Sequence, residues 1–127
     1  MNCPKCDALM EPVIFNELTI ERCTSCKGIW FPEAEHKELK AMPGSEVIDI
    51  GSAKEGKKND SIRSIPCPVC EIIMDGVDDT FQPHIHYESC PRGHGVYFDA
   101  GEYKDFKEES ISDFFKSLAM RFKNKKH

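Results

Sequence analysis

The chain has 127 residues, of which 39% are hydrophobic and 31% charged, and its formal net charge is −5. No apolar run is long enough to span a membrane, and the first residues match neither a signal peptide nor a transit peptide. We therefore expect a cytoplasmic protein without membrane insertion, in which reduced cysteines favour metal binding over disulfide bonds.

The chain opens on a Cys-Pro-x-Cys turn that aims the sulfurs of Cys3 and Cys6 at one point. A second pair, Cys23 and Cys26, follows at the separation found in zinc sites, about fifteen to twenty residues. Four thiolates in this pattern predict a closed, tetrahedral, structural zinc site. Rubredoxin-like iron uses similar sulfur turns and is the alternative metal.

A β-hairpin is predicted between these two cysteine pairs. Residues 9–15 and 18–22 have the composition of short strands, and Asn16-Glu17 forms the tip. The hairpin then delivers the second cysteine pair opposite the first, which is the arrangement of a zinc ribbon.

The residues after the second pair, 28–31, have the sequence Gly-Ile-Trp-Phe. We expect Trp30 and Phe31 to pack between sheet and helix rather than to stack on a nucleic-acid base. A helix follows, with Pro32 in its first turn and His36 as a packing residue, and it ends before Pro43-Gly44. Residues 43–65 show no sustained period and indicate a linker, with one short strand expected at 47–50.

The cysteine turn returns at Cys67-Pro68-Val69-Cys70. The second copy follows the first at an offset of 64 residues up to the hairpin and 67 beyond it, so that Cys90 matches Cys23. The three additional residues fall in the hairpin loop near 78–80, where an insertion costs little. Modules of about 40 residues need a stabilising element such as a metal site, because a hydrophobic core of that size rarely suffices alone.

The fourth ligand of the second site is displaced by one residue. Strict alignment places it at Gly93, which has no side chain, and His94 follows directly, so that Cys90-x3-His94 can complete the tetrahedron. His84 and His86, in the preceding strand, are the alternatives. The predicted ligands of the two zinc ions are Cys3, Cys6, Cys23 and Cys26, and Cys67, Cys70, Cys90 and His94.

A long amphipathic helix is predicted to follow the second site. Asp99-Ala100-Gly101-Glu102 has the pattern of a capping box, and the chain ends in a basic tail. Apolar residues at helical spacing form one stripe, namely Tyr103, Phe106, Ile111, Phe114, Phe115, Leu118 and Phe122. Such a stripe folds back over the modules, pairs with another copy or docks a partner, and we favour self-association or partner binding.

The expected fold is a small zinc-stabilised α+β protein with two tandem zinc ribbons, each a short antiparallel hairpin followed by a helix, the C-terminal one long. The expected divisions are 1–42 for the first ribbon and its short helix, 43–65 for the linker, 66–106 for the second ribbon, and 107–127 for the rest of the C-terminal helix and its basic tail.

The order of these motifs resembles the bacterial zinc-finger family that is named after the ribbon of transcription factor IIB. The resemblance covers residues 3–39 and 67–106, as two tandem copies. It implies that all seven cysteines are zinc ligands. Pro32 and Ala34 stand where the family tends to have Asp and Gly, and the second copy departs from the family pattern at Gly93-His94.

We expect a non-enzymatic protein, because the sequence has no nucleophile with a positioned base, no phosphate loop and no open metal site. A protein-interaction or assembly role through the C-terminal helix is favoured. A transcription-related nucleic-acid binder is the alternative, although residues 66–106 carry two basic against eight acidic residues, where a phosphate-binding face is usually basic. A rubredoxin-like iron or redox protein is the second alternative.

Overall fold

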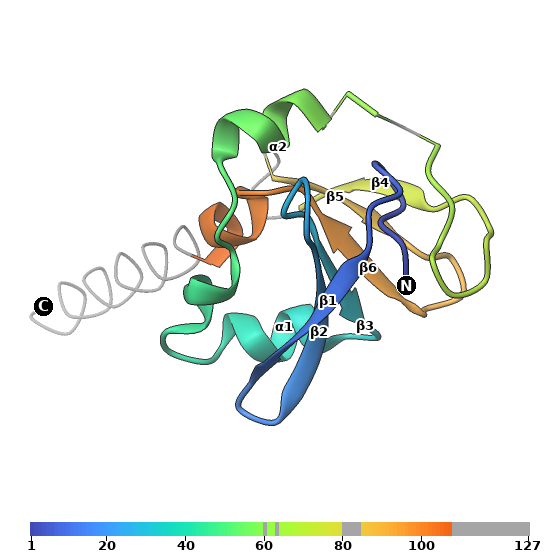
Figure 1. Cartoon of the computed structure of the whole chain (residues 1–127). Helices are drawn as coiled ribbons and strands as arrows, with labels where there is room; N and C mark the ends of the chain where they lie inside the picture. Colours follow the sequence, from blue (N-terminus) through green and yellow to red (C-terminus); the bar gives the residue numbers. More distant parts are fainter. Residues whose placement is uncertain (60, 63, 80–84, 108–127) are drawn as a thin grey trace, which may run out of the picture.

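The structure of the protein is a computed structural model that describes residues 1–59, 61–62, 64–79 and 85–107. Six strands form a single antiparallel sheet in the order β1-β2-β3-β6-β5-β4 (Figure 1). They are β1 (Met10–Phe15), β2 (Leu18–Cys23), β3 (Ile29–Pro32), β4 (Asp75–Asp78), β5 (His86–Ser89) and β6 (Gly95–Phe98). The coarse prediction of a small α+β fold is confirmed.

The hairpin of β1 and β2 turns where the sequence predicts. Phe15 pairs with Leu18, and the two residues between them, Asn16 and Glu17, have φ angles of 46° and 70°. Positive φ at both positions is what a tight two-residue hairpin turn requires. The local sequence therefore sets the register of this hairpin.

The centre of the sheet is the pairing of β3 with β6, in which Trp30 lies opposite Tyr97. These two residues occupy equivalent positions of the two cysteine motifs, 67 residues apart. The flanking pairs are equivalent as well, since Trp30 also pairs with Glu21 in β2 and Tyr97 with Glu88 in β5. The strand register therefore has two-fold symmetry about the Trp30–Tyr97 pair.

The outer hairpins follow the same register with one difference. Pro12 pairs with Glu21 in the first hairpin, and Gly76 pairs with Glu88 in the second. The partners are 64 and 67 residues apart, which places the three additional residues between β4 and β5. This is the loop in which the sequence predicts the insertion.

The helices are short in the described part of the chain. They are α1 (Glu35–Lys40), the 3-10 helix η1 (Ser45–Ile48) and α2 (Ala53–Asn59), and residues 102–107 are also helical. The strand expected at 47–50 is wrong, because η1 covers 47–48 and residues 49–50 belong to neither a strand nor a helix. The long C-terminal helix predicted for 107–127 lies outside the described residues beyond Lys107.

Two helix beginnings differ from the sequence prediction. Pro32 does not open α1 but ends β3, where it pairs with Gly95. The helical residues 102–107 are capped by Asp49, which lies in the segment predicted to be a linker. Its carboxylate accepts hydrogen bonds from the backbone N–H groups of Gly101 and Lys104, each at 2.9 Å. Long-range contacts thus decide both boundaries.

Both faces of the central strands are buried. Alternate residues of β3 and β6 point to opposite faces, so Phe31 and Phe98 join the core next to the helices while Trp30 and Tyr97 join the core around the cysteines. All four side chains are at most 1% exposed. The prediction that these aromatic residues pack internally is confirmed, and His36 packs against them as predicted.

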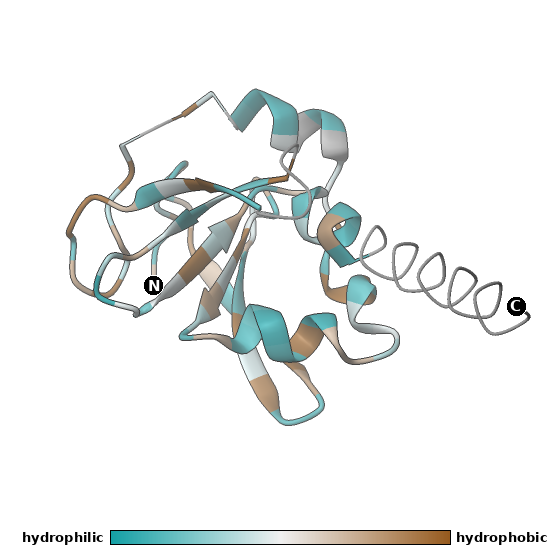
Figure 2. Ribbon diagram, turned by 180° about the vertical axis from the view of Figure 1, so that it is seen from behind, coloured by the Kyte–Doolittle hydropathy of each residue, from teal (hydrophilic) through white to brown (hydrophobic). Residues whose placement is uncertain are grey.

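Figure 2 shows the same division along the chain, with hydrophobic residues on the central strands and mainly hydrophilic residues on α2. The range 43–65, read as a linker, carries η1 and α2 and contributes the buried side chains of Ile48 and Ile65.

Candidate metal centres

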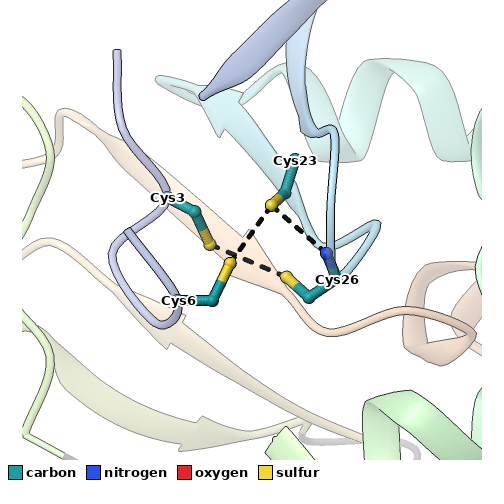
Figure 3. Close-up of side chains that lie close together, drawn as sticks. All are labelled: Cys3, Cys6, Cys23 and Cys26. Carbon is teal, nitrogen blue, oxygen red and sulfur yellow. Dashed lines mark hydrogen bonds between the residues drawn. The ribbon is translucent and has the colours of Figure 1, made fainter. Parts of the chain in front are cut away.

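The first centre lies between the turn that precedes β1 and the turn that follows β2. The four sulfurs of Cys3, Cys6, Cys23 and Cys26 lie within 4.8 Å of one another and point towards a common centre (Figure 3). Cys3 and Cys26 are 3.7 Å apart at their sulfurs, and Cys6 and Cys23 are 3.3 Å apart. A disulfide bond measures about 2.0 Å, whereas thiolates around tetrahedral zinc at about 2.3 Å are separated by roughly 3.8 Å. The geometry therefore suits a metal ion.

Backbone groups shape and polarise this centre. The N–H groups of Ser25 and Cys26 each point at the sulfur of Cys23 from 3.4 Å. Such bonds favour the thiolate form that a metal requires. In the metal-free protein, the hydrogen bond from the Cys3 thiol is the largest influence on Cys26 and lowers its pKa to about 4.

The second centre brings together Cys67, Cys70, Cys90 and His94, whose ligand atoms also lie within 4.8 Å of one another. The sulfurs of Cys70 and Cys90 are 3.6 Å apart, and Nδ1 of His94 lies 3.5 Å from the sulfur of Cys90. Gly93 takes a φ of 79°, which glycine adopts without strain. The turn thus presents the histidine one residue beyond the aligned cysteine position.

The alternative histidines lie elsewhere or are not described. His86 contacts two carboxylates instead, with Nδ1 at 2.9 Å from Asp78 and Nε2 at 3.3 Å from Glu88. His84 lies outside the described residues. Among the described side chains, His94 is the one that completes the second group.

Each centre thus offers four protein side chains, either four cysteines or three cysteines and one histidine. These are the donor sets of closed structural zinc sites, and all seven cysteines are free of disulfide bonds. The chain binds two zinc ions, one at each centre.

The first centre also receives a residue from the second half of the chain. The hydroxyl of Tyr97 lies 3.3 Å from the sulfur of Cys3 and 3.4 Å from that of Cys26. The ring passes over Gly28, where a Cβ atom would come within 1.8 Å of the tyrosine oxygen. The sequence does not predict this contact, because its repeat identifies Tyr97 only as a packing residue equivalent to Trp30.

A buried ion pair provides a second link between the halves. Nζ of Lys5, within the first cysteine turn, lies 2.7 Å from Asp99 and 3.5 Å from Glu88 and donates to the carbonyl of Asn59 at 3.0 Å. The Lys5 side chain is fully buried, and both carboxylates belong to residues only 3% exposed. Val69 occupies the equivalent position of the second turn, so the sequence repeat offers no signal for this pair.

Cysteine turns that close on zinc at the ends of short antiparallel strands define a zinc-ribbon protein. Residues 2–42 match the family model of the transcription factor zinc-finger, a zinc ribbon of the transcription factor IIB type. No curated protein and no solved structure matches the chain significantly. In the described part of the chain, none of the helices has the length and hydropathy needed to cross a membrane.

Proposed function

We propose that the protein is a non-enzymatic zinc-ribbon module that binds other proteins or assembles with itself. The observation that carries this proposal is that both zinc ions have four protein ligands and lie in the core that joins the two halves. Closed sites of this kind leave no position for a substrate, and they supply folding free energy of about 10–16 kcal/mol each. In this proposal the zinc ions stabilise the fold, and the protein surface makes the interactions with partners or other copies.

We further infer that the two halves are tandem copies of one unit, with ribbons at 1–42 and 66–106. The equivalent register on both sides of the Trp30–Tyr97 pair supports this reading. A cytoplasmic location is part of the proposal, because seven cysteines without disulfide bonds suit a reducing compartment.

The segment proposed for assembly is the part of the predicted C-terminal helix and tail that follows the buried Lys107, residues 108–127, whose apolar stripe continues the spacing of Tyr103 and Phe106. In the zinc-loaded full chain, replacing Phe114 and Phe115 by Asp should abolish self-association in light scattering and the retention of partners in a pull-down. An Ile14→Asp variant is the matched control, because Ile14 is 72% exposed on the hairpin of β1 and β2. Unchanged mass and unchanged partners in the double variant would contradict the proposal.

The structural role of zinc has its own test. EDTA at pH 7 should remove both ions and abolish the far-UV signal of the sheet, because the cores alone are too small to fold. A spectrum that survives chelation would refute that role.

Two other functions have distinct signatures. A nucleic-acid binder would show an affinity that falls steeply with salt, against which the acidic second half argues. A rubredoxin-like iron protein would be coloured when isolated from cells, whereas a zinc protein is colourless.

A further inference from the structure

A groove in the first half of the molecule is filled by the chain itself. Segment 48–59 lies there. The side chain of Arg22 donates a hydrogen bond to the carbonyl of Ile48 at 3.0 Å, and the side chain of Lys5 donates one to the carbonyl of Asn59 at 3.0 Å. Asp49 adds its carboxylate bonds to the backbone at Gly101 and Lys104. The groove is thus formed jointly by the first cysteine turns and the residues that follow β6.

The filling segment approaches its groove as closely as a backbone can. A Cβ atom at Gly51 would lie 2.4 Å from the Cβ of Ala100, and one at Gly56 would lie 1.8 Å from the carbonyl oxygen of Ala100. Only glycine permits this approach. Segment 48–59 therefore packs closely in this groove.

The two-fold register places a counterpart of this groove in the second half, with a volume of about 720 Å³. Its walls include Val69, Ser89, Glu33, Ala34, Lys37 and His94. These are the repeat equivalents of Lys5, Arg22, Ala100, Gly101, Lys104 and Lys27, which contact or flank the filling segment of the first groove. None of the residues that the structure describes fills this second groove, and we call it the open groove.

We propose that residues 108–127 of a second copy of the chain fill this open groove, an inference that rests on the self-association proposed above. Residue 107 is the repeat equivalent of residue 40, after which the chain runs into the first groove. The twenty residues of 108–127 exceed the twelve of segment 48–59. Residues 108–127 follow the helical residues 102–107 as the filling segment follows α1.

The chemistry of the open groove matches this occupant. Lys37 and Arg92 carry the charge opposite to that of the acidic residues 108, 109 and 113, and Glu33 the charge opposite to that of the five basic residues between 116 and 126. Val69 is 54% exposed and is an apolar surface of the kind that the phenylalanines at 114–115 would contact. Val69 and Ser89 replace the two cations that bind backbone carbonyls in the filled groove. A helix satisfies its own carbonyls, so this groove suits a helical occupant.

The occupant comes from a second copy because the sequence lacks a break at the required place. After α1, Pro43 and Gly44, with Gly44 at a φ of 83°, turn the chain towards the first groove. Residues 108–127 contain neither proline nor glycine, and their apolar spacing continues that of the preceding helical residues. We therefore assign the occupant of the open groove to a second copy of the chain.

Photo-crosslinking of the zinc-loaded full chain tests this arrangement. Copies labelled with ¹⁵N and unlabelled copies, both carrying Lys37→p-benzoylphenylalanine, are mixed, irradiated and digested. We expect mass spectrometry to find residue 37 linked to 108–127 in isotopically mixed pairs. The same substitution at Lys104, in the filled groove, is the control and should link to segment 48–59 within one chain.

The outcomes separate the two proposals. Links from residue 37 that stay within one chain, or that avoid 108–127 in a protein that is dimeric by light scattering, overturn the groove assignment and leave self-association standing. A monomeric protein refutes self-association itself. As a second measurement, Lys37→Glu should raise the dimer dissociation constant roughly ten-fold, and Lys57→Glu, with the same change of charge, should not; equal constants overturn the assignment.

Discussion

The hydroxyl of Tyr97 lies 3.3 Å from the sulfur of Cys3, so a residue of the second half hydrogen-bonds a ligand of the first zinc ion. The repeat partner of Tyr97 is Trp30, whose ring lies against Gly95 of the other half. Each central aromatic residue therefore crosses the axis of the sheet and packs in the opposite half. The two zinc centres share one core for this reason.

Removing this hydroxyl should weaken zinc binding at the first centre. In a Tyr97→Phe variant the thiolates lose one donor, and outer hydrogen bonds to metal ligands are worth about 10–100-fold in affinity. Competition with a chromophoric chelator measures the change. Tyr103→Phe is the control, because its hydroxyl bonds Ser45 at 2.9 Å and the residue belongs to the other core, next to the helices. Equal affinities in the two variants would count against a role for Tyr97.

Replacing His94 should cost the protein one zinc ion. His94→Ala leaves three cysteines and an open position at the second centre, so native mass spectrometry should show one ion per chain in place of two. His86→Ala should retain both ions, because this ring bonds Asp78 and Glu88. Two ions in the His94 variant would disprove the assignment.

Replacing Lys5 should destabilise the fold without removing its metal. Lys5→Met removes the buried ammonium group that lies 2.7 Å from Asp99 and 3.5 Å from Glu88, and breaking a buried pair on one side costs about 3–5 kcal/mol. Urea unfolding of the zinc-loaded protein measures the loss, and the zinc count should stay at two. Lys57→Met, at an exposed position of α2, should change the free energy of unfolding by at most about 0.5 kcal/mol. Similar effects of both substitutions would rule out a special role for the ion pair.

His36 should make the protein sensitive to mild acid. Burial among aromatic rings lowers the pKa of His36 to about 4, from an ordinary value of 6.5. Protonation therefore favours the unfolded chain, and the stability present above pH 6.5 is lost progressively as the pH falls towards 4. Between pH 7 and pH 5 the loss should be about 2 kcal/mol.

Zinc ligands are also protonated in acid, so the contribution of His36 must be isolated by comparison. His36→Phe keeps the ring packing and removes the titrating group, whose Nδ1 finds no hydrogen-bond partner among the described residues. Unfolding of both proteins in excess zinc gives two pH curves, which should diverge below pH 6.5. Parallel curves would show that His36 does not carry the effect.

Much of each centre follows from short stretches of sequence. The spacing of Cys3 and Cys6, and of Cys23 and Cys26, is a property of single turns, so residue order alone places the sulfurs in pairs. The hairpin tip at Asn16-Glu17 is equally local. The missing eighth cysteine pointed to His94 because the repeat exposed the gap. The binding of two zinc ions was therefore predictable.

The helix boundaries were less predictable because tertiary contacts override local preference. Pro32 has the geometry for a first helical turn, yet its pairing with Gly95 keeps it in β3. Asp49 lies in the segment that the sequence predicts to be a linker, yet its carboxylate accepts the backbone N–H of Gly101, more than fifty positions later.

The sequence by itself determined the donor sets, the spacing of the ligand turns and the strands that carry them, since these depend on neighbours along the chain. Only the tertiary structure decided that β3 pairs with β6, that Lys5 meets Asp99, and that Tyr97 reaches the sulfur of Cys3. The last two contacts join residues 94 positions apart. No local spacing encodes such a contact, because it depends on how two separately formed surfaces bury each other.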